Sequence, residues 1–129
     1  MATRALIGFI DDDRNLVATY NHYDGYPSGL GVKLAEYLQD FIVVNGLSSS
    51  EKIVANGLGC LAAQTVSYLK DGPGNIYLHK PSEKDWEDYE YFIWCKEGHG
   101  VWISIFDWNG HCIFVGEPDK LIEKFEYDR

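Results

Sequence analysis

The chain has 129 residues, 46% of them hydrophobic and 15% aromatic, and its 11 basic and 20 acidic side chains give a net charge of −9. This length and apolar content predict a single folded domain over residues 1–129 and exclude a chain that is disordered throughout. Direct nucleic-acid binding and attachment to an anionic membrane both need a basic surface, so the acidic balance argues against both. The partner that it favours is a protein with a basic surface.

Signals for targeting and for disulfide bonds are weak. The three cysteines, Cys60, Cys95 and Cys112, are odd in number and too widely spaced for a disulfide framework. We find no long apolar run followed by a cleavage site, and no apolar stretch that would span a bilayer. We therefore expect a cytoplasmic protein without membrane contacts.

Two strands are expected first, over residues 4–10 and 16–22. The polar residues 11–15 between them predict a turn, so the strands should pair as an antiparallel hairpin. A helix should begin after Gly31, because apolar residues recur there at helical spacing. These residues are Leu34, Leu38, Phe41 and Ile42.

Two more helices are expected in the middle of the chain. An Asn-Gly pair ends the first helix, and Ser48 and Glu51 then have the spacing of a capping box, which predicts a second helix from Ser48 to about residue 56. A third helix is expected over residues 58–69. Its apolar stripe comprises Leu58, Ala62, Thr65, Val66 and Leu69.

The second half of the chain is rich in aromatic residues and predicts four strands, over residues 75–79, 89–97, 101–107 and 111–115. Asn109 and Gly110 separate the last two strands and are typical of a type I′ turn. Pro118 and Asp119 open a last helix. The order β-β-α-α-α-β-β-β-β-α predicts an α+β fold of two layers, with the helices packed on one face of a mostly antiparallel sheet.

The connection between the second strand and the first helix, residues 20–31, is the best candidate for a binding site. Its glycines allow a ligand to approach the backbone closely, and its aromatic rings offer stacking surfaces. The candidate binding residues in it are Tyr20, His22, Tyr23, Asp24 and Tyr26. The alternative is a shaped turn, in which Pro27 fixes the backbone and Asp24 accepts amide hydrogen bonds.

Cys60 is the candidate nucleophile. It lies at the start of the third predicted helix, where the helix terminus favours the thiolate form, and Gln64 lies on the same polar side of that helix. A cysteine enzyme also needs a base, which His22, His79, His99 or His111 would supply. The alternative is that the small residues around Cys60 serve helix packing or a partner interface.

A zinc site is disfavoured. Cys95, His99, His111 and Cys112 lie near one another in the predicted sheet, but His111 and Cys112 are adjacent and so point to opposite faces of a strand. A two-residue site of Cys95 and His99 stays open. We expect no metal and no other cofactor.

Two surfaces are candidates for protein contacts. The strands carry aromatic residues on alternating sides, so one face should meet a partner or a second copy of the chain, and we expect a homodimer. These residues are Tyr89, Tyr91, Phe92, Trp94, Trp102, Phe106 and Trp108. Acidic residues also gather over 83–90 and 117–128, as a solvated surface or as an imitation of a phosphate backbone.

Three segments carry a resemblance to known proteins: Arg-Ala-Leu at residues 4–6, Asp-Gly-Tyr-Pro-Ser-Gly-Leu-Gly at 24–31 and Asn-Gly-Leu-Gly-Cys-Leu-Ala-Ala-Gln at 56–64. Together they resemble a broad group of uncharacterised phage and bacterial accessory proteins. The N-terminal third also resembles the phage Thoeris anti-defence family, whose members sequester signals of the cyclic ADP-ribose type. The chain lacks a basic stretch in its second half, so Arg4, Lys33 and Lys80 would have to bind the phosphates of such a signal.

These observations lead to one main hypothesis and two alternatives. The main hypothesis is a non-enzymatic, phage-type accessory protein that inhibits a host factor in the host cytoplasm by stoichiometric binding, through its acidic and aromatic surface. The first alternative is a sponge that holds a nucleotide-derived immune signal, such as cyclic ADP-ribose or a cyclic dinucleotide, at residues 20–31. The second is a cysteine-dependent enzyme centred on Cys60.

Overall fold

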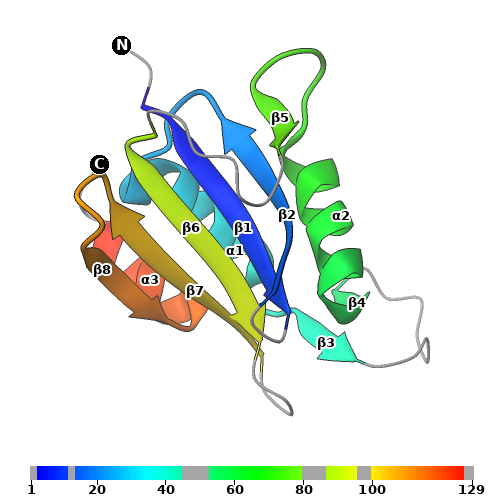
Figure 1. The fold of residues 1–129 in the computed structure, drawn as a ribbon. Helices are drawn as coiled ribbons and strands as arrows, with labels where there is room; N and C mark the ends of the chain where they lie inside the picture. Colours follow the sequence, from blue (N-terminus) through cyan, green and yellow to red (C-terminus); the bar gives the residue numbers. More distant parts are fainter. Residues whose placement is uncertain (1–2, 12–13, 45–52, 80–86, 96–99, 127–129) are drawn as a thin grey trace.

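The computed structural model describes residues 3–11, 14–44, 53–79, 87–95 and 100–126 (Figure 1). Six strands form one sheet in the order β5-β2-β1-β6-β7-β8. The strands are β1 (Ala5–Asp11), β2 (Arg14–Asn21), β5 (Ile76–His79), β6 (Tyr89–Cys95), β7 (Val101–Asp107) and β8 (Cys112–Gly116). The β1–β6 pair is parallel and the other four pairs are antiparallel, so the predicted α+β fold with a mostly antiparallel sheet is confirmed.

The helices pack against one face of this sheet. A single π-helical turn, η1 (Pro27–Gly31), continues directly into α1 (Val32–Leu38), and α2 (Gly57–Leu69) and α3 (Pro118–Phe125) follow. Figure 1 shows α1 and α3 behind the sheet and α2 along its β2–β5 side. Within the described ranges, none of these helices has the length and apolar character needed to cross a membrane.

The core lies between the sheet and the helices. In β6 and β7 the large core residues alternate along the strand, as the two-residue period of a pleated strand requires, whereas residues 5–9 of the central strand β1 are all buried. The fully buried strand residues include Ile7, Phe9, Tyr91, Ile93, Ile103 and Ile105, and the helices add Leu34, Leu38, Leu61 and Leu121. Each large apolar side chain contributes roughly 1.5–3 kcal/mol when it is fully removed from water.

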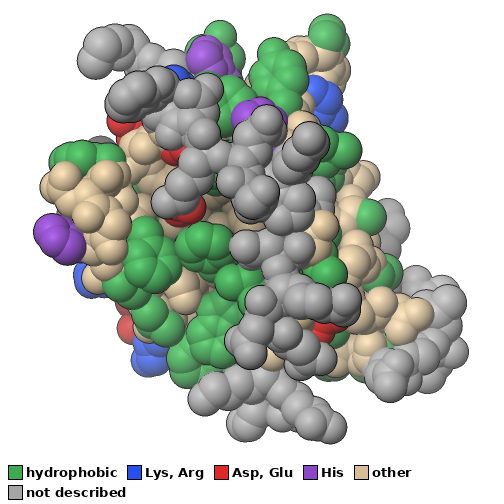
Figure 2. Space-filling model, in the orientation of Figure 1, with side chains coloured by type: hydrophobic (Ala, Val, Ile, Leu, Met, Phe, Trp, Pro, Cys, Tyr) green, Lys and Arg blue, Asp and Glu red, His purple; other side chains and the backbone are tan. Residues whose placement is uncertain are grey.

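The opposite face of the sheet, which the helices do not cover, carries a second set of aromatic rings. We call it the open face and define it by Tyr20, Phe92, Trp94, Trp102 and Phe106. Trp94 and Trp102 pair across two strands with ring centroids 5.3 Å apart, and Trp94 Nε1 donates to Ser104 Oγ at 3.0 Å. Figure 2 shows hydrophobic side chains gathered over β6 and β7 on this face. The prediction that alternation divides the aromatic residues between two faces is therefore confirmed.

The middle of the chain differs from the prediction. The first helix ends at Leu38 instead of reaching Ile42, and Ile42 is 55% exposed at the start of β3 (Ile42–Val44). The predicted second helix is wrong over its described end, because Val54–Asn56 forms β4, and residues 48–52 lie outside the described residues. The parallel pairing of Ile42 with Val54 explains both changes, since β-branched residues suit a strand once a partner strand is present.

The turn between β7 and β8 also differs from the prediction. A type I′ turn needs positive φ at both central residues. Gly110 has φ of 79°, but Asn109 is not among the described residues with positive φ. The Asp107 carboxylate instead accepts hydrogen bonds from the amides of Asn109 and His111, at 2.9 and 3.0 Å. This side-chain cap holds a longer turn, in which the glycine alone is left-handed.

Candidate functional site

Hydrogen bonds attach the predicted loop, residues 20–31, to Thr3, which precedes β1, and to Tyr91 of β6. Gly25 N donates to Thr3 O at 2.9 Å, and the buried Tyr91 hydroxyl donates to Gly25 O at 2.7 Å. A Cβ at position 25 would lie 2.8 Å from Ala5 Cβ, so glycine alone fits there. The loop is therefore a preformed part of the scaffold.

Residues 24–30 of this loop form hydrogen bonds with one another, and η1 begins within them at Pro27. Pro27 occupies the first turn, where its missing amide proton costs nothing. Leu30 N donates to Asp24 O, and Gly29 N donates to Tyr26 O, both at 2.9 Å. Gly29 has no room for a side chain, because a Cβ would lie 2.8 Å from both Asp24 O and the Tyr26 ring. These contacts fix the direction in which Tyr26 projects.

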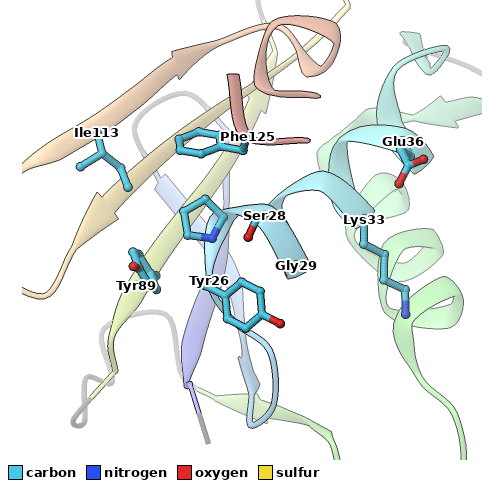
Figure 3. Close-up of a pocket in the computed structure, with 9 residues that line it drawn as sticks. Tyr26, Ser28, Gly29, Lys33, Glu36, Tyr89, Ile113 and Phe125 are labelled. Atoms are coloured by element: carbon cyan, nitrogen blue, oxygen red, sulfur yellow. The ribbon is translucent and has the colours of Figure 1, made fainter. Parts of the chain in front are cut away.

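Tyr26 stands between two adjoining hollows, which we call the aromatic lobe and the polar lobe. The aromatic lobe has a volume of about 840 Å³ (Figure 3). Tyr89 at the start of β6, Ile113 in β8 and Phe125 at the end of α3 form its apolar wall. On the other side Figure 3 shows Lys33 and Glu36, with Tyr26 and Ser28 between the wall and these charges. An apolar wall facing a few polar groups is typical of ligand pockets.

The polar lobe is smaller, about 270 Å³, and shares Tyr26, Gly29 and Lys33 with the aromatic lobe. Asn21, Tyr23, Asp24, Leu30, Leu69 and Asn75 complete its lining. Asp24 and Asn75 have φ of 55° and 68°, and among the described residues they are the non-glycine positions in the left-handed region. Asn and Asp tolerate that region best, and such positions often mark binding sites.

The two lobes are close to electrical balance in a strongly acidic chain. Of the described residues that line them, Lys33 is the cation, opposed by Glu36 in the aromatic lobe and by Asp24 in the polar lobe. The Lys33 amine lies 5.8 Å from the centre of the Tyr68 ring. Burial, and then the nearby Asp88 and Asp107, raise the pKa of Tyr89, so its hydroxyl is neutral at physiological pH. The lobes therefore offer rings and neutral hydrogen-bonding groups rather than a strong field.

Three of the residues predicted for the site line these lobes, namely Tyr23, Asp24 and Tyr26. Tyr20 and His22 do not line them. The Tyr20 hydroxyl lies 2.7 Å from His22 Nδ1, and the Tyr20 ring stacks on His79 with centroids 5.3 Å apart. The ladder of β2 explains this separation, because Asn21 faces the helices and the adjacent Tyr20 must then face the open side.

The other two predicted residues lie elsewhere. Arg4 lies just before β1, and its backbone amide donates to Asp88 Oδ2 at 2.9 Å. Gln64 lies on α2, and its side-chain amide donates to Val54 O at 3.3 Å. Neither residue lines a lobe, and Lys80 lies outside the described residues. Sequence reasoning missed Tyr89, Ile113 and Phe125 as parts of this site, because only the tertiary fold brings their three elements to the loop.

Cys60 lies in the first turns of α2, half-buried and packed against the core. Its thiol donates a weak hydrogen bond to Gln64 Oε1 at 3.5 Å. An amide oxygen is no general base, so this contact does not make a nucleophile. Across the described part of the chain, no group of three or more His, Cys, Asp or Glu side chains is arranged to hold a metal ion. His99, one of the metal ligands considered, lies outside the described residues.

Comparison with known proteins adds no relative. No family model, curated protein or solved structure matches this chain.

Proposed function

We propose that this protein binds a small molecule at the aromatic and polar lobes and does not transform it. The observation that carries the proposal is the pair of adjoining hollows around Tyr26, built on a rigid loop. A preformed site lowers the entropic cost of binding, which suits a protein that sequesters a ligand.

The aromatic lobe favours a planar ring as one part of the ligand. Tyr26, Tyr89 and Phe125 offer ring surfaces within one hollow, and a stacked base contributes roughly 1–3 kcal/mol per aromatic contact. Ser28 and Lys33 lie on the other side of this hollow from Tyr89 and Ile113, where they would meet the rest of the ligand (Figure 3).

The polar lobe favours hydroxyl and amide groups beside that ring. Asn21, Asp24 and Asn75 line it, and one lysine shared by both lobes matches at most a small phosphate charge. A nucleoside or a cyclic nucleotide combines these features. The resemblance of the N-terminal third of the chain to the phage Thoeris anti-defence family supports the same ligand class, a nucleotide-derived immune signal.

The test is a thermal-shift screen followed by calorimetry, with cyclic ADP-ribose, cyclic dinucleotides, NAD and nucleoside monophosphates as probes. We expect at least one probe to stabilise the wild type. Tyr26→Ala should weaken that probe's affinity by about tenfold or more, and Lys33→Met should weaken binding of phosphorylated probes only. Tyr77→Ala and Lys120→Met remove an exposed tyrosine and an exposed lysine outside both lobes, and should leave affinity unchanged. A panel without any stabilising probe would contradict the proposal.

A second candidate function is inhibition of a host protein through the open face, and the aromatic cluster on that face favours it. Phe92, Trp94, Trp102 and Phe106 are half-buried there, and rings of this kind are enriched at protein interfaces. With a net charge of −9, the chain would attract a basic partner. We expect a basic protein captured from host lysate at about 50 mM salt to be released at about 500 mM. Capture that persists at the higher salt would rule out the charge-driven form of this interaction.

A further inference from the structure

One side of α2 is exposed and carries no charge. None of the 13 residues of α2 is charged, although the chain holds 20 acidic and 11 basic residues. Its inner side lies in the core, and Tyr68 packs on Tyr37 of α1 with ring centroids 4.0 Å apart. A third side is turned toward β5, along the flank of the molecule seen in Figure 1. Surfaces depleted of charge are typical of the centres of protein interfaces.

On that side an apolar hollow adjoins an apolar projection. Gly59, Ala62, Ala63 and Val66 of α2 line the hollow together with Leu78 of β5, and its volume is about 360 Å³. Leu78 is 69% exposed, the largest exposed fraction among the large apolar residues described. A Cβ added at Gly59 would meet no atom within 4 Å, so the hollow has room for an incoming side chain. We call this surface the α2–β5 groove.

We infer that a second copy of this chain occupies the α2–β5 groove. A projecting leucine beside a hollow of glycine and alanine is self-complementary, because each copy offers the projection that the other can receive. This is the geometry of a twofold interface. It differs from the contact through the aromatic strands that the sequence alone favours.

The absence of charge from α2 allows a second copy to approach at this groove. Two chains of net charge −9 repel each other wherever their acidic surfaces meet. An uncharged helix is the part of the surface where that repulsion is weakest. A basic partner would gain nothing from this groove, because α2 has no carboxylate to pair with it.

A lysine side chain occupies a backbone carbonyl of each edge strand of the sheet. Lys70 Nζ donates to the carbonyls of Gly74 and Ile76 beside β5, at 2.6 and 2.8 Å. Lys124 Nζ donates to Ile113 O of β8, at 2.9 Å. A carbonyl that already accepts from a lysine is a poorer partner for the amide of a further strand. The second copy should therefore dock through side chains and not by extending the sheet.

The test is the oligomeric state of the wild type and two matched variants by sedimentation equilibrium at micromolar concentration. We expect a dimer for the wild type and at least a tenfold weaker dimer for Leu78→Glu. Val115→Glu makes the same change at the opposite sheet edge, where Val115 is 51% exposed, and should leave the dimer intact. Circular dichroism checks that both variants fold. We expect that they do, because both side chains are exposed.

Salt gives a second readout. Added salt screens the repulsion between two acidic copies, so the dimer should strengthen or stay constant as salt rises. A monomeric wild type, or a dimer that Leu78→Glu leaves unchanged, would overturn the inference. Neither result would bear on ligand binding at the two lobes, because other residues line them.

Discussion

Tyr91 shows how one residue in the sheet can determine the shape of a distant loop. It is completely buried on β6, and its hydroxyl donates to the carbonyl of Gly25, 66 positions earlier in the chain. Its ring also lies against Gly31, where an added Cβ would come within 3.4 Å. A buried carbonyl needs a donor, so phenylalanine cannot replace this tyrosine without leaving that carbonyl unpaired.

We predict that Tyr91→Phe lowers the free energy of unfolding by about 1–3 kcal/mol, because the Gly25 carbonyl loses its partner in the core. Urea unfolding followed by circular dichroism measures this change. Tyr68→Phe, which keeps the exposed ring stacked on Tyr37, is the control and should be nearly neutral.

The stability of the wild type and of Tyr91→Phe should also depend differently on pH in the alkaline range. Burial, and to a lesser extent Tyr89, raises the pKa of Tyr91 well above its usual value, whereas the unfolded chain has the ordinary pKa of about 10. Above that pH the unfolded chain loses a proton that the folded chain keeps, so stability is intact below about pH 10 and falls as pH rises further. Tyr91→Phe should lose stability less steeply than the wild type over this range. Equal slopes would show that Tyr91 is not the titrating group.

At the scale of single residues, the sequence located part of the candidate site. Tyr23, Asp24 and Tyr26 lie within two residues of Gly25 in the predicted loop, and all three line the polar lobe. Tyr20 was grouped with them because it is close in sequence, but strand alternation carries it to the other face. The predicted strand over residues 16–22 already places Tyr20 and Asn21 on opposite faces of the sheet.

At the scale of elements, local signals predicted the strands, the third helix and the last helix well. Three antiparallel pairs, β1–β2, β6–β7 and β7–β8, join strands that follow one another in the chain, so the short turns between them predicted this part of the sheet. The antiparallel β2–β5 pair joins strands that are far apart in the chain, and no turn predicts it. The β3–β4 pair was not predicted, because each strand has three residues and depends on a partner 12 positions away in the chain (Ile42 pairs with Val54). The capping-box spacing at Ser48 carried no information about that pairing. The parallel β1–β6 pair joins the two halves of the chain, and no local sequence pattern predicts it.

The walls of the aromatic lobe were beyond prediction for the same reason. The loop was recognisable, but Ile113 and Phe125 reach it only because β8 and α3 pack at that side of the sheet. Neither residue differs in type from ordinary core residues. Sequence therefore located one side of the site, and tertiary packing supplied the other.

At the scale of the whole molecule, charge is distributed unevenly over the surfaces that matter. The chain carries a net charge of −9. Even so, the charged residues that line the two lobes are one lysine and two carboxylates, and the helix beside the α2–β5 groove has no charge. The acidic surplus lies outside these places. This division fits the proposed ligand of low charge and the proposed contact with a second copy of the chain.

The most direct test of the central claim is native mass spectrometry of the wild type and Tyr26→Ala after incubation with the small-molecule extract of bacterial cells. The account predicts that the wild type retains a nucleotide-sized compound that Tyr26→Ala does not retain. It also predicts that the compound released on denaturation has the same mass as one already present in the extract. Retention by both proteins, or release of a compound that the extract did not contain, would contradict binding without turnover at the two lobes.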